Sequence, residues 1–259
     1  EFRRVLFRSW RKFEVGNLFQ LLMLDTRSIY RDKQLNIEDY FDGNSINKSK
    51  YKRDLSVDRK LIGLEQMLWI KNNLNKKFKW SIIGQQVLMA QVYLPTIFAN
   101  MNKKILPSYL HKYLKIGGAN VPYNTDAWDG YPKERERLFK ELKKANSVLV
   151  LTGDTHNSWL NNLYDENNNF IGVEIGTPAI SSPNTIDTFG SLTDGIEEGF
   201  IKENKNVKWT EGRHKGYTLL KLTKDKSEVS FVYVNTVKSK VYEVIDTNKF
   251  NVKPNTPII

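Results

Sequence analysis

Two segments of the sequence place charged side chains directly after an apolar run. In the segment Val148–His156, the run ends at a glycine, and a carboxylate and an imidazole follow two positions apart. Residues i and i+2 of extended backbone point to the same side, so Asp154 and His156 are expected to bind one metal ion together. The second segment ends in Asp25 and Arg27, and a guanidinium suits two parallel hydrogen bonds to a phosphate.

Both patterns also have a structural explanation. An ion pair between Asp25 and Arg27 that fixes the start of a loop accounts for the second segment equally well. A turn aspartate and a capping histidine account for Asp154 and His156, because Gly-Asp pairs are common in turns. We favour the metal interpretation for this pair and count Asp25 as a further candidate ligand. If the two strands are neighbours, their ends bring all of these side chains into one cleft.

Other polar residues nearby have two interpretations each. Asn157 and Ser158 are expected either to contribute an oxygen ligand or a phosphate contact, or to cap a helix. Tyr131 either forms the wall of a pocket or packs where a loop meets a helix. Glu174 stands in an apolar strand, where a charge needs a partner, so it either contacts the site or points to solvent.

Hydrophobic patterning predicts the elements that position these residues. Helices are expected from Gly63 and from Pro132, and long loops over residues 30–60 and 103–131. The expected strands, of which the last two form a hairpin, are Phe19–Asp25, Trp80–Met89, 147–152, Phe170–Thr177, Tyr217–Leu222 and Glu228–Asn235. Mixed αβ units followed by a hairpin favour a layered α/β architecture over a helix bundle or a pure β-sandwich.

Composition restricts the class of protein. A chain of 259 residues with 40% hydrophobic and 12% aromatic residues can bury a sizeable core. No apolar run approaches the roughly 20 residues that a membrane helix needs. The sequence contains no cysteine, which excludes disulfides and thiolate ligands within it. No charged, apolar and small-residue pattern of an export signal stands at its start.

The formal net charge of +11 suits an anionic substrate, a nucleic acid or an acidic surface. A basic module that binds nucleic acid or an anionic surface is therefore an alternative to an enzyme, and it predicts binding that falls steeply with salt. The basic residues are scattered, however, and the sequence contains no recognisable nucleic-acid recognition motif. The sequence does not define an oligomeric state.

Taken together, these segments resemble the alkaline phosphatase D family of metallophosphoesterases. They occur in family order over roughly residues 10–225, and no one of them suffices alone. The matching segments are Met23–Arg27, Gly63–Gln66 with Trp69, Trp80–Gln86 with Met89 and Ala90, Trp128–Pro132 with Glu134, Arg135, Arg137 and Leu138, Leu151–Ser158 and Glu174–Pro183.

The resemblance implies the four-layer metallophosphatase fold, in which two packed sheets are flanked by helices. It also implies hydrolysis of phosphomonoesters or phosphodiesters, from small molecules to nucleotides, at a metal pair of iron and calcium, and a secreted, periplasmic or cell-surface location. Asp154 and His156 match the last metal-binding motif of the family, with Asn157 beside them. Arg27 matches a position suited to a phosphate contact. Asp129 and Tyr131 match a loop beside the cleft.

The sequence departs from the family pattern in one respect. The Gly-Asp segments that supply the bridging carboxylate and further ligands in such enzymes are not found in it. We therefore expect a partial metallophosphatase domain over residues 10–250, with weak or no activity alone, preceded by a non-native leader (1–9) and followed by a tail (251–259). A family member that keeps the scaffold without the chemistry is a further alternative.

Overall fold

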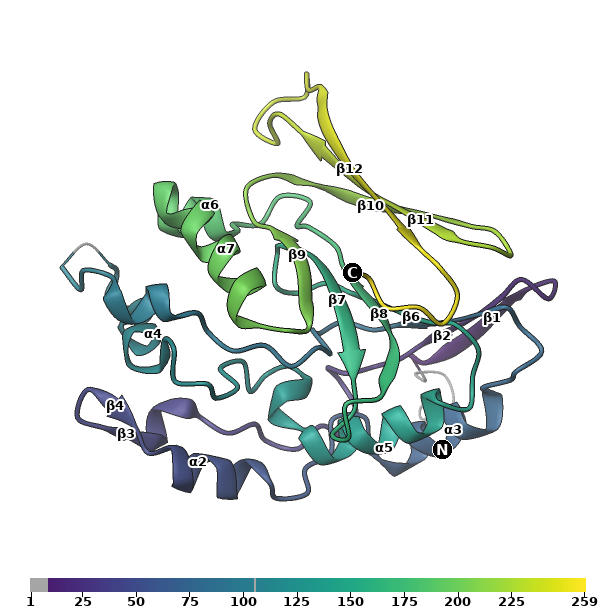
Figure 1. The fold of residues 1–259 in the computed structure, drawn as a ribbon, viewed down its shortest axis with the longest axis horizontal. Helices are drawn as coiled ribbons and strands as arrows, with labels where there is room; N and C mark the ends of the chain where they lie inside the picture. Colours follow the sequence, from purple (N-terminus) through teal and green to yellow (C-terminus); the bar gives the residue numbers. More distant parts are fainter. Residues whose placement is uncertain (1–8, 105) are drawn as a thin grey trace.

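The computed structural model describes residues 9–104 and 106–259, so the leader predicted for residues 1–9 lies, apart from Ser9, outside the described residues. A seven-stranded sheet forms the centre of the molecule (Figure 1). In spatial order its strands are β1 (Arg11–Val15), β2 (Phe19–Met23), β5 (Trp80–Gly84), β6 (Val148–Thr152), β8 (Phe170–Gly176), β7 (Ser158–Tyr164) and β9 (Val207–Glu211).

Four adjacent strands of this sheet run parallel. They are β2, β5, β6 and β8, whereas β1, β7 and β9 pair antiparallel to their neighbours. The carboxyl ends of all four parallel strands therefore meet at one edge of the sheet. Side chains that follow β2, β5 and β6 are brought together there although they lie far apart in the sequence.

Helices cover one face of the large sheet (Figure 1). The predicted helices are present as α3 (Gly63–Asn73) and α5 (Pro132–Leu142). Their buried side chains share one hydrophobic cluster with Ile83 and Val150 of the sheet. The chain also forms the helices α2 (Lys48–Leu55), α4 (His111–Ile116), α6 (Thr185–Phe189) and α7 (Thr193–Glu203). Among the described helices, none combines the length and apolar character that crossing a bilayer requires.

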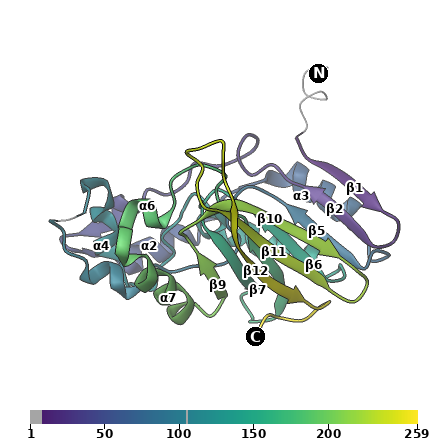
Figure 2. The same cartoon turned by 90° about the horizontal axis from the view of Figure 1, so that it is seen from above.

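A second, antiparallel sheet covers part of the opposite face (Figure 2). Phe231 and Val229 of its central strand share a buried cluster with Ile82 and Leu160 of the large sheet. The strands of this sheet are β10 (Lys215–Leu222), β11 (Ser227–Val234) and β12 (Val244–Val252). The expected mixed architecture of two packed sheets with helices is thus confirmed.

The small sheet leaves the β1–β2 end of the large sheet open (Figure 2). On this end, Phe13 is 49% exposed and Val15 is 50% exposed. The outer face of β10 is also open, with Tyr217 at 52% and Leu219 at 57% exposure. Strand β10 pairs with β11 on one side only, so its other edge carries no strand among the described residues. Apolar surface and a free strand edge therefore lie next to each other.

The two long loops expected from the sequence are only partly loops. Residues 30–60 contain helix α2 and a two-stranded hairpin of β3 (Phe41–Asp42) and β4 (Ser45–Ile46), and residues 103–131 contain α4. Tyr51 is fully buried, and its hydroxyl donates to the carbonyl of Pro122 at 2.7 Å, which links the two regions. The polar composition of the two regions did not indicate this packing, because few apolar residues take part in it.

Glu174 on β8 neither faces solvent nor contacts the candidate site. It is fully buried and accepts hydrogen bonds from the backbone N–H groups of Met89 (2.5 Å) and Ala90 (2.9 Å) and from the Asn161 side chain (2.9 Å). Glu174 thereby links strand β8 to strand β7 and to the segment after β5. Burial raises the pKa of Glu174 to about 7, although its hydrogen bonds act in the opposite direction.

The raised pKa of Glu174 predicts a pH-dependent stability. Because the folded state favours the neutral carboxyl, the contribution of Glu174 to the free energy of unfolding is fully present below pH 4.5. This contribution is lost as the pH rises through about 7. We expect this group to lower the free energy of unfolding by about 2 to 3 kcal/mol between pH 5 and pH 8. Urea unfolding of Glu174→Gln and of wild type at both pH values measures the difference. Glu198→Gln, an exposed control on α7, should behave as wild type, and an equal pH dependence of all three proteins would contradict the prediction.

Candidate active site

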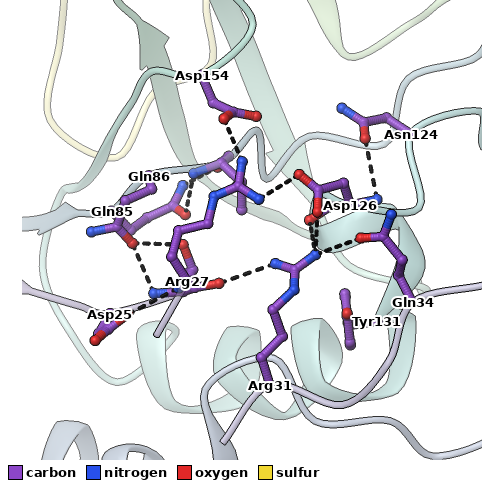
Figure 3. A network of polar contacts seen from close by, with 12 residues as sticks. Asp25, Arg27, Arg31, Gln34, Gln85, Gln86, Asn124, Asp126, Tyr131 and Asp154 are labelled. Carbon is purple, nitrogen blue, oxygen red and sulfur yellow. Dashed lines mark hydrogen bonds and ion pairs between the residues drawn. The ribbon is translucent and has the colours of Figure 1, made fainter. Parts of the chain in front are cut away.

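A glutamine after β5 holds the ends of β2 and β6 together (Figure 3). The Gln86 side-chain oxygen accepts from the backbone N–H (2.8 Å) and the hydroxyl (2.6 Å) of Thr26, and its amide donates to the carbonyl of Leu24 at 2.9 Å. The backbone carbonyl of Gln86 accepts from the N–H of Gly153 at 3.2 Å. The condition that the two strands are neighbours is not met, because β5 lies between β2 and β6. Their ends still meet across Gln86.

Arg27 and Asp154, both predicted as site residues, form an ion pair (Figure 3). A second ion pair joins Arg27 to Asp126, so that the guanidinium bridges two carboxylates from different loops. All three side chains are about one-third exposed, at 34%, 34% and 35% for Arg27, Asp154 and Asp126. Burial acts to lower the pKa of Arg27, but the two carboxylates outweigh it and raise that pKa. The guanidinium is therefore fixed and charged at the sheet edge.

Asp126 and a second arginine belong to this network but were not predicted. Arg31 contacts the Asp126 carboxylate at 2.5 Å, donates to the Asp126 carbonyl at 2.7 Å and donates to the Thr26 carbonyl at 3.0 Å. Its guanidinium lies 5.2 Å from the centre of the Tyr131 ring. Neither Asp126 nor Arg31 stands at a strand end, so sequence pattern gave no signal for them beyond the spacing of four between Arg27 and Arg31.

Asp25 fixes the turn that follows β2 and is not directed at Asp154. Its carboxylate is nearly buried and accepts from the backbone N–H groups of Arg27 (2.9 Å) and Ser28 (2.8 Å) and from the hydroxyl of Ser9. Burial acts to raise the pKa of Asp25, but these hydrogen bonds outweigh it and the pKa lies below its ordinary value. Figure 3 shows the carboxylate pointing away from Asp154, which corrects its prediction as a shared metal ligand.

The backbone of Asp154 and His156 is not extended, as the sequence interpretation required. Both have left-handed conformations, with φ of +70° and +65°, and the N–H of Thr155 donates to the Gly153 carbonyl at 2.8 Å in a tight turn. The expectation that the two side chains point the same way was therefore based on the wrong geometry. Asp154 turns to Arg27, whereas Nδ1 of His156 lies 2.7 Å from the Pro183 carbonyl oxygen.

The three predicted substrate contacts other than Arg27 are buried in structural roles. Asn157 pairs with the hydroxyl of Thr185 at 2.7 Å and holds the start of α6. Asp129 is paired with Arg135 at 2.6 Å in the interior. The Tyr131 ring is fully buried, and its hydroxyl donates to a backbone carbonyl at 2.8 Å. Packing, the structural alternative for Tyr131, describes what that side chain does here. Asn157 is not a helix N-cap, because the N-cap of α6 is Asn184 and Asn157 contacts Thr185 from outside the helix.

The residues present do not fit a complete metal centre. Over residues 9–104 and 106–259, no three His, Asp or Glu side chains gather where they could hold one ion. Of the predicted ligands, Asp154 is paired with Arg27 and Asp25 is occupied by its own turn. His156, the third predicted ligand, lies at the end of β6 with Nδ1 at the Pro183 carbonyl, and no reaction step through a metal can be derived from this arrangement.

Two cavities meet at the Arg27–Asp154 ion pair. The first, here called the sheet cleft, has a volume of about 640 Å³ and lies between the two sheets, with mostly apolar walls that include Leu21, Met23 and Leu220. The second, here called the loop cleft, has a volume of about 580 Å³ and lies among the loops on the other side of Asp154. Arg27 lines the sheet cleft, and its partners Asp126 and Asp154 line the loop cleft.

Comparison with known proteins agrees with this fold and shows the family. A solved structure of PhoD superimposes with a TM-score of 0.67 at 27% identity, over 94% of this chain and 42% of that chain. Alkaline phosphatase D of Bacillus subtilis (strain 168) is 32% identical over 222 residues, which are 83% of this chain. The chain spans about a third (32%) of the length of that relative. Residues 4–231 match the family described as PhoD-like phosphatase, and the chain therefore belongs to this family.

Proposed function

We propose that this chain is part of a phosphoester hydrolase in which Arg27 binds the phosphoryl oxygens of the substrate. The observation that carries the proposal is the position of Arg27 at the carboxyl edge of the parallel strands, where the two clefts meet. A guanidinium has five N–H donors, and the two ion pairs use two of them. Three donors remain for a ligand. A small phosphoester or nucleotide as substrate, and location outside the cytoplasm, rest on the family resemblance.

The carboxylate partners of Arg27 do not prevent this role. Ion pairs at this degree of exposure contribute only about 0–1 kcal/mol each. A phosphate dianion forms stronger, bidentate hydrogen bonds with a guanidinium and competes with them. The hydrogen bonds from Gln86 to Leu24 and Thr26 hold the backbone before Arg27, so that the side chain starts from a fixed point. Arg27 would therefore orient the phosphoryl group and neutralise its charge.

The proposal includes a metal pair of iron and calcium that this chain does not complete by itself. Asp154 and His156 would supply two ligands, and the others would come from a part of the protein outside this sequence. The relative in Bacillus subtilis is about three times as long as the matched portion, which supports this view. The free edge of β10 and the open end of the large sheet support it as well, because such surfaces are normally covered.

Removal of Arg27 should weaken anion binding. Arg27→Ala deletes the guanidinium and leaves Asp154 unneutralised, while Asp126 keeps its ion pair with Arg31, so we expect inorganic phosphate and vanadate to bind at least about tenfold more weakly. Arg27→Lys keeps the charge without the planar fork and should fall between the two. Isothermal titration calorimetry at low ionic strength gives the dissociation constants.

The matched control for this experiment is Arg53→Ala. Arg53 lies on α2 with its side chain 73% exposed, and among the described residues its ion-pair partner is its neighbour Asp54. Its removal lowers the net charge by the same amount, and it should leave phosphate affinity within about twofold of wild type. If Arg27→Ala and Arg53→Ala lower the affinity equally, the effect reflects overall charge, and Arg27 has no special role.

The isolated chain should hydrolyse phosphoesters poorly. Because no three candidate metal ligands gather in the described part of the chain, we expect little or no turnover of p-nitrophenyl phosphate or its bis-ester, even with added iron and calcium salts. Absorbance at 405 nm, roughly the p-nitrophenolate maximum, follows the product. Strong, metal-dependent turnover that Asp154→Asn abolishes would show that the site is complete in this chain and would refute the partial-domain proposal.

A further inference from the structure

A small cavity lies among α4, α6 and α7, which share one end of the molecule (Figures 1 and 2). Its volume is about 130 Å³, and its walls consist largely of aromatic rings. It is here called the aromatic cavity. The proposed role of Arg27 does not involve any of these rings, which are Phe98, Tyr113, Tyr123, Trp159, Phe189 and Phe200.

The rings of the aromatic cavity hold one another in place. Phe98 packs edge to face against Phe189, with ring centres 5.4 Å apart, and against Tyr113 at 6.0 Å. Phe200 packs in the same way against Trp159 at 5.2 Å. Aromatic pairs prefer this geometry because the positive edge of one ring meets the negative face of the other. The cavity therefore has walls of defined shape.

The aromatic cavity is buried on one side and accessible on the other. Phe98, Trp159 and Phe200 are nearly fully buried, whereas Tyr113 and Phe189 are only partly buried. The indole N–H of Trp159 donates to the hydroxyl of Thr155 at 2.8 Å, so this polar group of the wall is already paired. The interior of the cavity thus offers mainly apolar surface to a ligand.

The aromatic cavity adjoins the loop cleft. Tyr113, Tyr123 and Thr155 line both of them. Thr155 directly follows Asp154, the ion-pair partner of Arg27, and consecutive Cα atoms lie about 3.8 Å apart. The substituent of a phosphoester bound at Arg27 can therefore extend past Asp154 toward the aromatic cavity.

The size and the lining of the aromatic cavity fit a single six-membered ring. Protein interiors contain few voids larger than a water molecule, whereas apolar cavities of about 150 Å³ accept one benzene molecule. Aromatic walls add edge contacts to a bound ring beyond the burial of its apolar surface. The sheet cleft also has apolar walls, but its volume is about 640 Å³ and no aromatic ring among the described residues lines it.

We propose that the aromatic cavity binds the ring of aryl phosphoesters, which makes phosphate esters of single-ring phenols a substrate class of this site. The proposal rests on the proposed function, because the phosphoryl group would lie at Arg27 while the ring lies against Tyr113 and Phe189. In hydrolysis, water adds to phosphorus as the bond from phosphorus to the phenolic oxygen breaks. The phenol leaves with a proton from that water.

Three phosphomonoesters that differ only in their substituent test this proposal. Phenyl, cyclohexyl and methyl phosphate are titrated into the 259-residue chain by calorimetry at pH 8, about two units above their second pKa. The wild type should bind phenyl phosphate at least about tenfold more tightly than methyl phosphate, because the ring is buried. Cyclohexyl phosphate should bind about threefold more weakly than phenyl phosphate, because it lacks the aromatic edge contacts.

Two variants remove one wall of the aromatic cavity each. Tyr113→Ala on α4 and Phe189→Ala on α6 should each lose most of the preference for phenyl phosphate. Both should keep their affinity for methyl phosphate within about twofold of wild type, since neither residue contacts Arg27 in the structure. Far-UV circular dichroism verifies that each variant is folded, and either variant alone suffices for the test.

Three matched controls should keep the tenfold preference. Tyr217→Ala and Phe13→Ala remove exposed rings from β10 and β1, and Leu220→Ala shortens a wall of the sheet cleft. The proposal is overturned if the wild type binds phenyl phosphate no more tightly than methyl or cyclohexyl phosphate. It is also overturned if Leu220→Ala, rather than Tyr113→Ala and Phe189→Ala, loses the preference, because the ring then lies in the sheet cleft.

Phenol and Arg27→Ala separate this proposal from the proposed function. Phenol has no phosphoryl group, so wild type and Arg27→Ala should bind it equally, and Phe189→Ala should bind it at least about fivefold more weakly. Saturation-transfer NMR measures this binding. If Arg27→Ala leaves the affinity for methyl phosphate unchanged, the proposed function fails, while phenol still reports on the cavity. Absence of phenol binding to the wild type would overturn the assignment of the cavity.

Discussion

The site depends on the bridge that Gln86 makes between strand ends that are not adjacent. Parallel pairing of β2, β5 and β6 brings their carboxyl ends to one edge, but each exit is a loop that needs its backbone groups satisfied. Gln86 satisfies those of Leu24, Thr26 and Gly153 at once. One side chain and one carbonyl thereby fix the origin of both loops, and the Arg27–Asp154 contact follows from them.

The parts of the fold that sequence predicted are those in which apolar patterning and burial agree. Strands β2, β5, β6, β8, β10 and β11 and helices α3 and α5 are of this kind. Strand β7 escaped notice because Asn161 and Asn162 interrupt it, yet both are fully buried and Asn161 pairs with Glu174. Helix α7 contains Gly195 and Gly199, which approach the segment around Pro95 closely and weaken the helical signal. Tertiary contacts of this kind leave no periodic trace.

The candidate site was predicted in part for a similar reason. Residue type and position after a strand identified Arg27 and Asp154, and these two side chains do meet. The expected common direction of Asp154 and His156 assumed extended backbone, which the left-handed turn does not provide. Asp126 comes from a loop about a hundred residues from Arg27 in sequence, so only the folded chain reveals it. The local sequence pattern identifies the residues at strand ends, whereas the topology of the sheet determines which residues they contact.

The left-handed backbone at Asp154 and His156 bears on laboratory evolution of this protein. Glycine adopts that conformation without steric cost, whereas a residue with a Cβ atom costs roughly 1 kcal/mol or more there. Glycine would relieve this backbone cost at both positions, but at position 154 it deletes the carboxylate beside Arg27. Libraries selected for thermal tolerance alone could therefore retain variants that are stable but lack the Asp154 carboxylate at the end of β6. Both codons should be held constant in such libraries.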